Sequence, residues 1–190
     1  MEALLISTGV VAIAEIGDKT QLLAIVLAAR FRKPLPIILG ILVATLLNHA
    51  AAAAIGVVVA KYLSGPLFQG LVGAGFVAMA LWALIPDKED DDAGARTMGG
   101  VFLTTLVAFF LVEIGDKTQI ATTLLGARFQ NVALVTAGTT LGMMAANVPA
   151  VLLGEAVTKV VPLKYVRIGA AILFGIIGLW VLLAVFAGSR

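Results

Sequence analysis

The sequence predicts an all-α integral membrane protein with six transmembrane helices, arranged as two inverted repeats of three helices each. Composition, six long apolar runs and an internal duplication predict this fold. Of the 190 residues, 61% are hydrophobic and 13% are charged, and the mean hydropathy is +1.10, which is far from the values of soluble domains. The absence of cysteine excludes disulfides and thiolate metal sites. The net charge of +2 is too small, and the basic residues too scattered, for a nucleic-acid surface.

Six apolar runs are long enough to cross a hydrocarbon layer of roughly 30 Å, which takes about 20 helical residues. Alternation with a period of two residues is absent and glycine is frequent in the runs, so the sequence predicts a helical bundle and not a barrel. The first run has no basic leading region and carries acids in its middle, so we expect it to be retained rather than cleaved as a signal peptide. The predicted helices comprise residues 3–27, 36–60, 67–85, 101–125, 132–158 and 165–187.

The two halves of the chain resemble each other at a constant offset of 98 residues. This offset aligns residues 15–31 with residues 113–129, and 11 of these 17 positions are identical. The same offset pairs Gly40 with Gly138, Gly56 with Gly154 and Trp82 with Trp180. Because each half holds an odd number of helices, the second half enters the membrane from the opposite side. We therefore divide the chain into a first repeat (residues 1–85), an acidic linker (86–98) and a second repeat (99–190).

Lysine and arginine residues near the ends of the runs predict the orientation. Eight of them gather on one side of the predicted membrane and three on the other. The two sets are Arg30, Arg32, Lys33, Lys88, Arg96, Lys159, Lys164 and Arg167 on one side, and Lys61, Arg128 and Arg190 on the other. The sequence thus predicts a cytoplasmic linker and two outside termini. The acidic run at residues 89–92 could attract cations, but a solvated linker is the interpretation that we favour.

The stretch EIGDKTQ occurs at residues 15–21 and again, letter for letter, at residues 113–119. Glu15 lies about 12 residues into its predicted helix. This position is roughly 18 Å below the membrane surface and therefore near the midplane. On a continuous helix the glutamate, aspartate and lysine of each copy share one face, and this face must point into the bundle. Gly17 and Gly115 leave room there for a partner helix or an ion. If the two motif helices cross at the pseudo-twofold axis, four carboxylates converge on one site: Glu15, Asp18, Glu113 and Asp116.

Charge and chemistry suggest what this site binds. Four carboxylates with Lys19 and Lys117 leave a formal charge of −2, which one divalent cation would neutralise. Oxygen ligands suit manganese, calcium or magnesium, whereas copper and zinc more usually recruit histidine or cysteine. Two protons would also neutralise the site, because burial favours the uncharged carboxylic acid. Hydroxyls and amides of the motif are candidate extra or supporting ligands: Thr20, Gln21, Thr118 and Gln119.

Other polar residues have two interpretations each. Salt bridges from each motif glutamate to its own lysine would lock helices together, but they do not explain the recurring aspartate. The lysines could keep the carboxylates together when no metal is bound, compete with the metal as cations, or extend toward the lipid headgroups. His49 and the equivalent Asn147 could line the cavity or only hydrogen-bond between helices. Pro149 has no counterpart in the first half and is predicted to kink the fifth helix.

Two copies of an ExGDKT signature, each opening a three-helix repeat and joined by an acidic linker, resemble the calcium/proton antiporter-2 family over essentially the whole chain. That family includes bacterial manganese exporters and the calcium and manganese exchangers of Golgi and chloroplast membranes. The short length and the absence of an extended leader resemble the bacterial members. The resemblance implies that transport depends on the four motif carboxylates. It also implies Mn²⁺ or Ca²⁺ as transported substrate, no prosthetic group, and export across a bacterial plasma membrane.

The sequence therefore predicts a secondary transporter that exchanges a divalent cation for protons by alternating access. In this hypothesis one three-helix repeat rocks against the other around a midplane site. The alternative is a cation channel or uniporter with the acids as a selectivity ring. A metalloenzyme is disfavoured because the chain has a single histidine and its acids are symmetric, whereas catalysis needs distinct acid and base environments.

Overall fold

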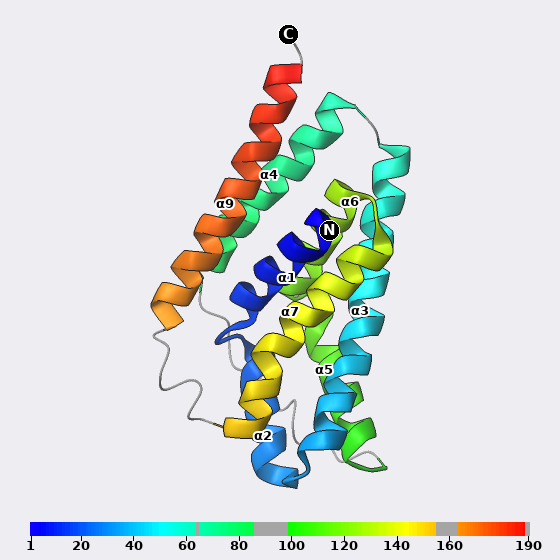
Figure 1. The fold of residues 1–190 in the computed structure, drawn as a ribbon, viewed down its shortest axis with the longest axis vertical. Helices are drawn as coiled ribbons and strands as arrows, with labels where there is room; N and C mark the ends of the chain where they lie inside the picture. Colours follow the sequence, from blue (N-terminus) through cyan, green and yellow to red (C-terminus); the bar gives the residue numbers. More distant parts are fainter. Residues whose placement is uncertain (64, 86–98, 155–162, 189–190) are drawn as a thin grey trace.

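The computed structural model describes residues 1–63, 65–85, 99–154 and 163–188, and the regular structure in these ranges is helical (Figure 1). The predicted linker lies outside the described residues, as do Lys88, Arg96, Lys159 and Arg190, which contributed to the predicted orientation. The helices are α1 (Glu2–Glu15), α2 (Lys19–Phe31), α3 (Pro34–Tyr62), α4 (Pro66–Ala83), α5 (Val101–Glu113), α6 (Lys117–Phe129), α7 (Val132–Leu153) and α9 (Leu163–Gly188).

Four of the six predicted helices are present as single helices, namely α3, α4, α7 and α9. By length and composition, these four are also the described helices that could cross a membrane alone. The prediction of one continuous helix through each motif is wrong. The first predicted helix ends at Glu15 and resumes at Lys19, and the fourth ends at Glu113 and resumes at Lys117.

The glycine of each motif explains the break. Gly17 has a φ of 77° and Gly115 a φ of 76°, and both values lie in the left-handed region that side chains disfavour. Ile16 before Gly17 and Asp18 after it have extended backbones, so three consecutive residues leave the helical path. Each resulting helix has 13 or 14 residues and measures about 20 Å, so only a pair of them can span roughly 30 Å.

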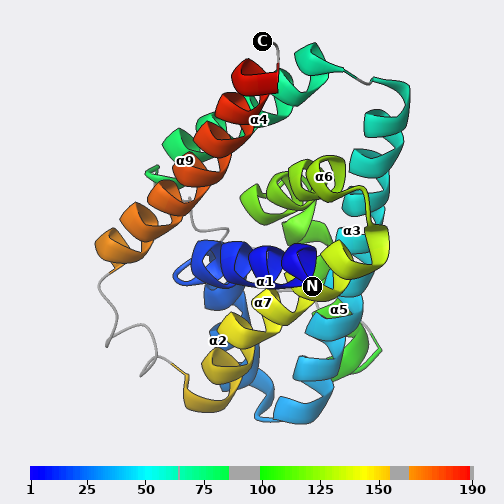
Figure 2. The same ribbon diagram turned by 45° about the horizontal axis from the view of Figure 1, so that its top comes forward.

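Each broken pair packs against a long helix from the other half of the chain. α7 packs on α1 and α2, whereas α3 packs on α5 and α6. We call these groups the α1–α2–α7 bundle and the α3–α5–α6 bundle; α3 and α7 touch where the two bundles meet. α4 and α9 lie side by side along one flank (Figures 1 and 2). The halves are therefore interwoven, and the expected movement of one sequence repeat as a separate bundle would have to disrupt this packing.

Glycines allow the close approach within both bundles. A Cβ on Gly126 of α6 would lie 2.5 Å from the carbonyl oxygen of Ala53 in α3. A Cβ on Gly142 of α7 would lie 2.6 Å from the carbonyl oxygen of Thr8 in α1. Because backbone atoms cannot move aside cheaply, only glycine fits at these crossings, as is typical of helix packing in membranes.

The distribution of polar residues is reversed with respect to a soluble protein. Leu5, Leu67 and Leu183 are more than half exposed, whereas the glutamates of both motifs are fully buried. An apolar exterior around buried charges is the arrangement expected when lipid surrounds the protein. Other strongly exposed apolar residues are Leu35, Leu71, Leu152, Ile176 and Phe186.

Candidate functional site

Both motif copies lie at helix breaks, and a glutamine closes each break. The N–H of Gly17 donates to Gln21 Oε1 at 2.8 Å, and the N–H of Gly115 donates to Gln119 Oε1 at 2.7 Å. A break of this kind places the last carbonyls of one helix beside the next helix N-terminus, a feature typical of ion sites in transporters. The sequence predicted that the glutamate and the aspartate of each motif share one face of a continuous helix, and this prediction is wrong. They flank the break instead.

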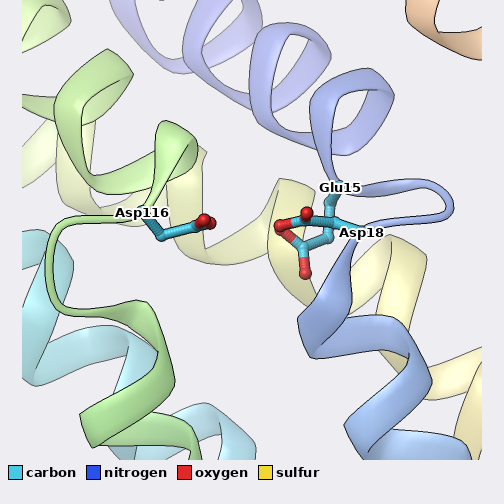
Figure 3. Close-up of side chains that lie close together, drawn as sticks. All are labelled: Glu15, Asp18 and Asp116. Carbon is cyan, nitrogen blue, oxygen red and sulfur yellow. The ribbon is translucent and has the colours of Figure 1, made fainter. Parts of the chain in front are cut away.

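Three of the four predicted carboxylates come together between the two bundles. Glu15, Asp18 and Asp116 each offer a carboxylate oxygen, and these oxygens lie within 4.8 Å of one another. The three side chains are 0%, 3% and 3% exposed, respectively. Figure 3 shows Asp116 extending from the α5–α6 break toward Glu15 and Asp18 at the α1–α2 break. We refer to these three residues as the carboxylate cluster.

The fourth carboxylate, Glu113, lies outside this cluster and is bound by α3. Asn48 Nδ2 donates to Glu113 Oε2 at 2.9 Å, and Thr45 Oγ1 donates to Glu113 Oε1 at 3.3 Å. His49 Nε2 is 3.7 Å from the same Oε1. Sequence reasoning missed Thr45, although Thr45, Asn48 and His49 form a polar stripe with helical spacing on an otherwise apolar helix.

Glu15 has donors on one of its oxygens and none on the other. Thr20 Oγ1 and Asn147 Nδ2 both donate to Glu15 Oε1, the second at 3.1 Å. Glu15 Oε2 is buried and accepts no hydrogen bond from the described residues. An unsatisfied buried carboxylate oxygen is unfavourable, and a cation in the cluster would satisfy it.

The two motif lysines have different partners. Lys19 Nζ lies 3.4 Å from Asp116 Oδ1, so it joins the α2 and α6 ends of the two breaks. Lys117 Nζ donates to the carbonyl oxygen of Ile85 at 2.8 Å and lies 5.9 Å from the centre of the Trp82 ring. The hypothesis of a salt bridge from Glu15 to Lys19 is not what the structure shows, since Lys19 reaches across to the other motif. The carboxylate cluster together with Lys19 carries a formal charge of −2.

The remaining predicted residues support the site rather than line the cluster. Thr118 Oγ1 donates to Asp116 Oδ2 at 3.1 Å. Gln21 Nε2 donates to the carbonyl oxygen of Ala146 at 3.0 Å, which ties the first break to α7. Pro149 lies inside α7, close after Asn147.

A small cavity of about 20 Å³ reaches the cluster at Asp18. Gly17, Lys117 and Arg167 of α9 also line it. Its volume is sufficient for about one water molecule.

Comparisons with known proteins identify the family and one similar protein. The family model described as "Divalent cation/proton antiporter GDT1" matches residues 3–91 and again residues 101–189, so that each match contains one motif copy. A protein of Vibrio cholerae serotype O1 named "Putative manganese exporter" is 52% identical over 175 residues, which cover 92% of this chain and 87% of that protein. No solved structure matches the chain.

Proposed function

This chain belongs to the divalent cation/proton antiporter GDT1 family, and from that premise we propose that it exports Mn²⁺ from the cytosol in exchange for protons. Ca²⁺ is the alternative substrate. The observation that carries the proposal is the buried carboxylate cluster, which both motif copies build at facing helix breaks. The family and the similar protein are both described as transporters, so we propose no enzymatic reaction.

The chemistry of the cluster supports a hard divalent cation as substrate. Its ligand atoms are carboxylate oxygens, which Mn²⁺ and Ca²⁺ both accept. With Glu113 as a further ligand, the four motif carboxylates together with Lys19 and Lys117 carry a formal charge of −2, which one such ion neutralises. The name of the Vibrio cholerae protein favours Mn²⁺. We propose that Glu113 joins Glu15, Asp18 and Asp116 as the fourth carboxylate ligand during transport.

Proton exchange follows from the same charge balance. A buried site with two uncompensated negative charges is unfavourable in a medium of low dielectric constant. Either one divalent cation or two protons removes this charge, so the two kinds of ligand compete for the same carboxylates. Competition of this kind is sufficient to couple metal export to proton entry.

The architecture that we propose has six membrane crossings in two inverted repeats, comprising residues 1–85 and 99–190. α3, α4, α7 and α9 each cross alone, while α1 with α2 and α5 with α6 cross as broken pairs. The nearly equal lengths of the two broken pairs and their shared break geometry support this assignment. Both termini would lie outside a bacterial plasma membrane, and residues 86–98 would lie in the cytoplasm.

Alternating access in this architecture would move the α1–α2–α7 bundle against the α3–α5–α6 bundle. Glu15 is held by Asn147 within the first of these bundles, and Glu113 is held by Asn48 within the second. Asp116 alone reaches across to the carboxylates of the other bundle. Separating the bundles on one side of the membrane would open the cluster there, and α3 against α7 would form the pivot.

Proteoliposomes with a pH-sensitive dye inside test this function when Mn²⁺ is added outside. We expect Mn²⁺ entry with matching proton exit for the wild type, and neither for Glu15→Gln. Glu2→Gln is the matched control, because Glu2 is an exposed acid at the other end of α1. Mn²⁺ entry without proton movement would contradict antiport and favour the channel or uniporter. Repeating the assay with Ca²⁺ establishes the order of the two substrates.

A further inference from the structure

We propose that Thr45 and Asn48 of α3 form a docking position for Glu113, which keeps this carboxylate out of the cluster and releases it to the cation during transport. The two residues are thus positioning residues for a fourth ligand. This inference rests on the proposed function, because it assigns a role to Glu113 in cation binding.

The geometry at the end of α5 supports a built docking position. Asn48 Nδ2 donates to Glu113 Oε2 at 2.9 Å and also to the carbonyl oxygen of Phe110 at 3.1 Å. Phe110 lies in the last turn of α5, where carbonyl groups lack helical donors. One amide thus binds both the glutamate and the free backbone end of its helix. Thr45 binds the other carboxylate oxygen of Glu113.

Burial makes these hydrogen bonds significant for Glu113. The side chains of Thr45 and Glu113 are fully buried, and Asn48 is 3% exposed. Hydrogen bonds to a charged group are stronger than neutral ones, and a buried carboxylate that loses them must find another partner. The cation site is the partner that the proposed function offers. Docking on α3 and binding to the cation are therefore alternatives for Glu113.

α7, the long helix that binds Glu15, has no counterparts of Thr45 and Asn48. The offset of 98 residues places Met143 at the position of Thr45 and Ala146 at the position of Asn48. Neither side chain can donate a strong hydrogen bond to Glu15. Glu15 is bound instead by Asn147 and Thr20 and lies in the cluster. The different placement of the two glutamates thus follows from residues of α3 and α7 and not from the motifs.

Docking makes a prediction for affinity. Undocking Glu113 opposes cation binding, so removal of the α3 donors should tighten the binding of Mn²⁺. Hydrogen bonds to charged groups correspond to about tenfold in an equilibrium constant, and we expect a decrease of about tenfold in the Kd of Asn48→Leu. Thr45→Val, whose bond is longer, should decrease the Kd by about threefold.

The experiment is a titration of Mn²⁺ into the purified full chain, followed by calorimetry or by the electron paramagnetic resonance of free Mn²⁺. Asn48→Leu is measured alone and in a Glu113→Ala background. Glu113→Ala removes the carboxylate that Asn48 binds. Adding Asn48→Leu to Glu113→Ala should therefore change the Kd by less than about twofold. A second pair of variants, Thr45→Val and Thr45→Ser, serves in case Asn48→Leu does not fold. Thr45→Val removes the hydroxyl, whereas Thr45→Ser keeps it and should retain the wild-type Kd.

Each outcome is decisive. Tighter binding that disappears without Glu113 supports the docking position. An unchanged Kd, or the same change in both backgrounds, overturns the docking position. The proposed function still stands in that case if the wild-type protein binds and exchanges Mn²⁺. No Mn²⁺ binding by the wild type overturns the proposed function and the docking position with it.

Discussion

The two EIGDKTQ copies have the same seven residues and nearly the same backbone, yet their side chains have different partners. In the first copy, Glu15 belongs to the carboxylate cluster and the break is half-buried. In the second, Glu113 binds to α3, and Ile114 at the break is 55% exposed. The motif therefore sets the chemistry and the break, while the long helix from the opposite half sets where each glutamate lies.

This difference bears on the proposed mechanism, because the two repeats of an inverted-repeat transporter exchange roles between access states. If the two halves were in equivalent environments, the site would be open to both sides or to neither. In the structure one glutamate lies in the cluster and the other is bound by α3, which is the asymmetry that the proposed alternating cycle requires of a single state. The variants below either remove this asymmetry or measure its size.

The largest effect is expected from Asp116→Asn, which removes the one carboxylate that bridges the two bundles. Loss of one member of a buried charge group costs about 3–5 kcal/mol, so we expect Mn²⁺ affinity and exchange to fall by a factor of at least about 100. Asp18→Asn should have the same effect, because both acids contribute oxygens to the cluster. Proteoliposome flux measures this change, and near-normal flux in either variant would exclude the cluster as the transport site.

Gly115→Ala should destabilise the fold by about 1–2 kcal/mol, because its φ of 76° lies in the left-handed region. A Cβ at Gly115 would meet nothing within 4 Å, so the backbone conformation alone causes this loss. Gly70→Ala is the matched control, since Gly70 also has open space but lies inside α4. Chemical denaturation in detergent should show opposite signs for the two variants, as alanine favours a regular helix. A stabilised Gly115→Ala would indicate that the break is not a fixed feature.

The sequence predicted the duplication and the buried acids, because identical residues recur at one constant offset and each half matches the family model. The inverted arrangement of the two halves stays a prediction. It could not predict the helix breaks, since the spacing of glutamate, aspartate and lysine also fits one face of a continuous helix. Gly17 is compatible with a helix as well as a break, and the break is fixed by Gln21, which accepts from the Gly17 N–H and donates to the distant Ala146. The separate location of Glu113 depends on Thr45 and Asn48, which lie about 65 residues away along the chain. Local patterns do not contain such long-range partners.

Lys19→Gln and Lys117→Gln compare the two motif lysines. Lys19 neutralises Asp116 in the cluster, so its removal should tighten Mn²⁺ binding by a few-fold, consistent with about 1 kcal/mol for a partly exposed ion pair. Lys117 donates one of its hydrogen bonds to the carbonyl oxygen of Ile85, so we expect Lys117→Gln to change Mn²⁺ affinity less than Lys19→Gln. Titration of both variants measures the difference. Equal effects would show that the two lysines serve the site in the same way, and the asymmetry would then be confined to the glutamates.

Gln21→Ala and Gln119→Ala should show the smallest difference, because each side chain closes its own helix break. Both variants lose the acceptor for a glycine N–H, but among the described residues only the Gln21 side chain also donates to the other half of the chain, at the carbonyl oxygen of Ala146 in α7. One net hydrogen bond contributes about 1 kcal/mol, so Gln21→Ala should unfold more easily than Gln119→Ala by about that amount. Denaturation of the two variants side by side measures it. If Gln119→Ala unfolded more easily than Gln21→Ala, the α5–α6 break would be held more firmly by its neighbours than the α1–α2 break.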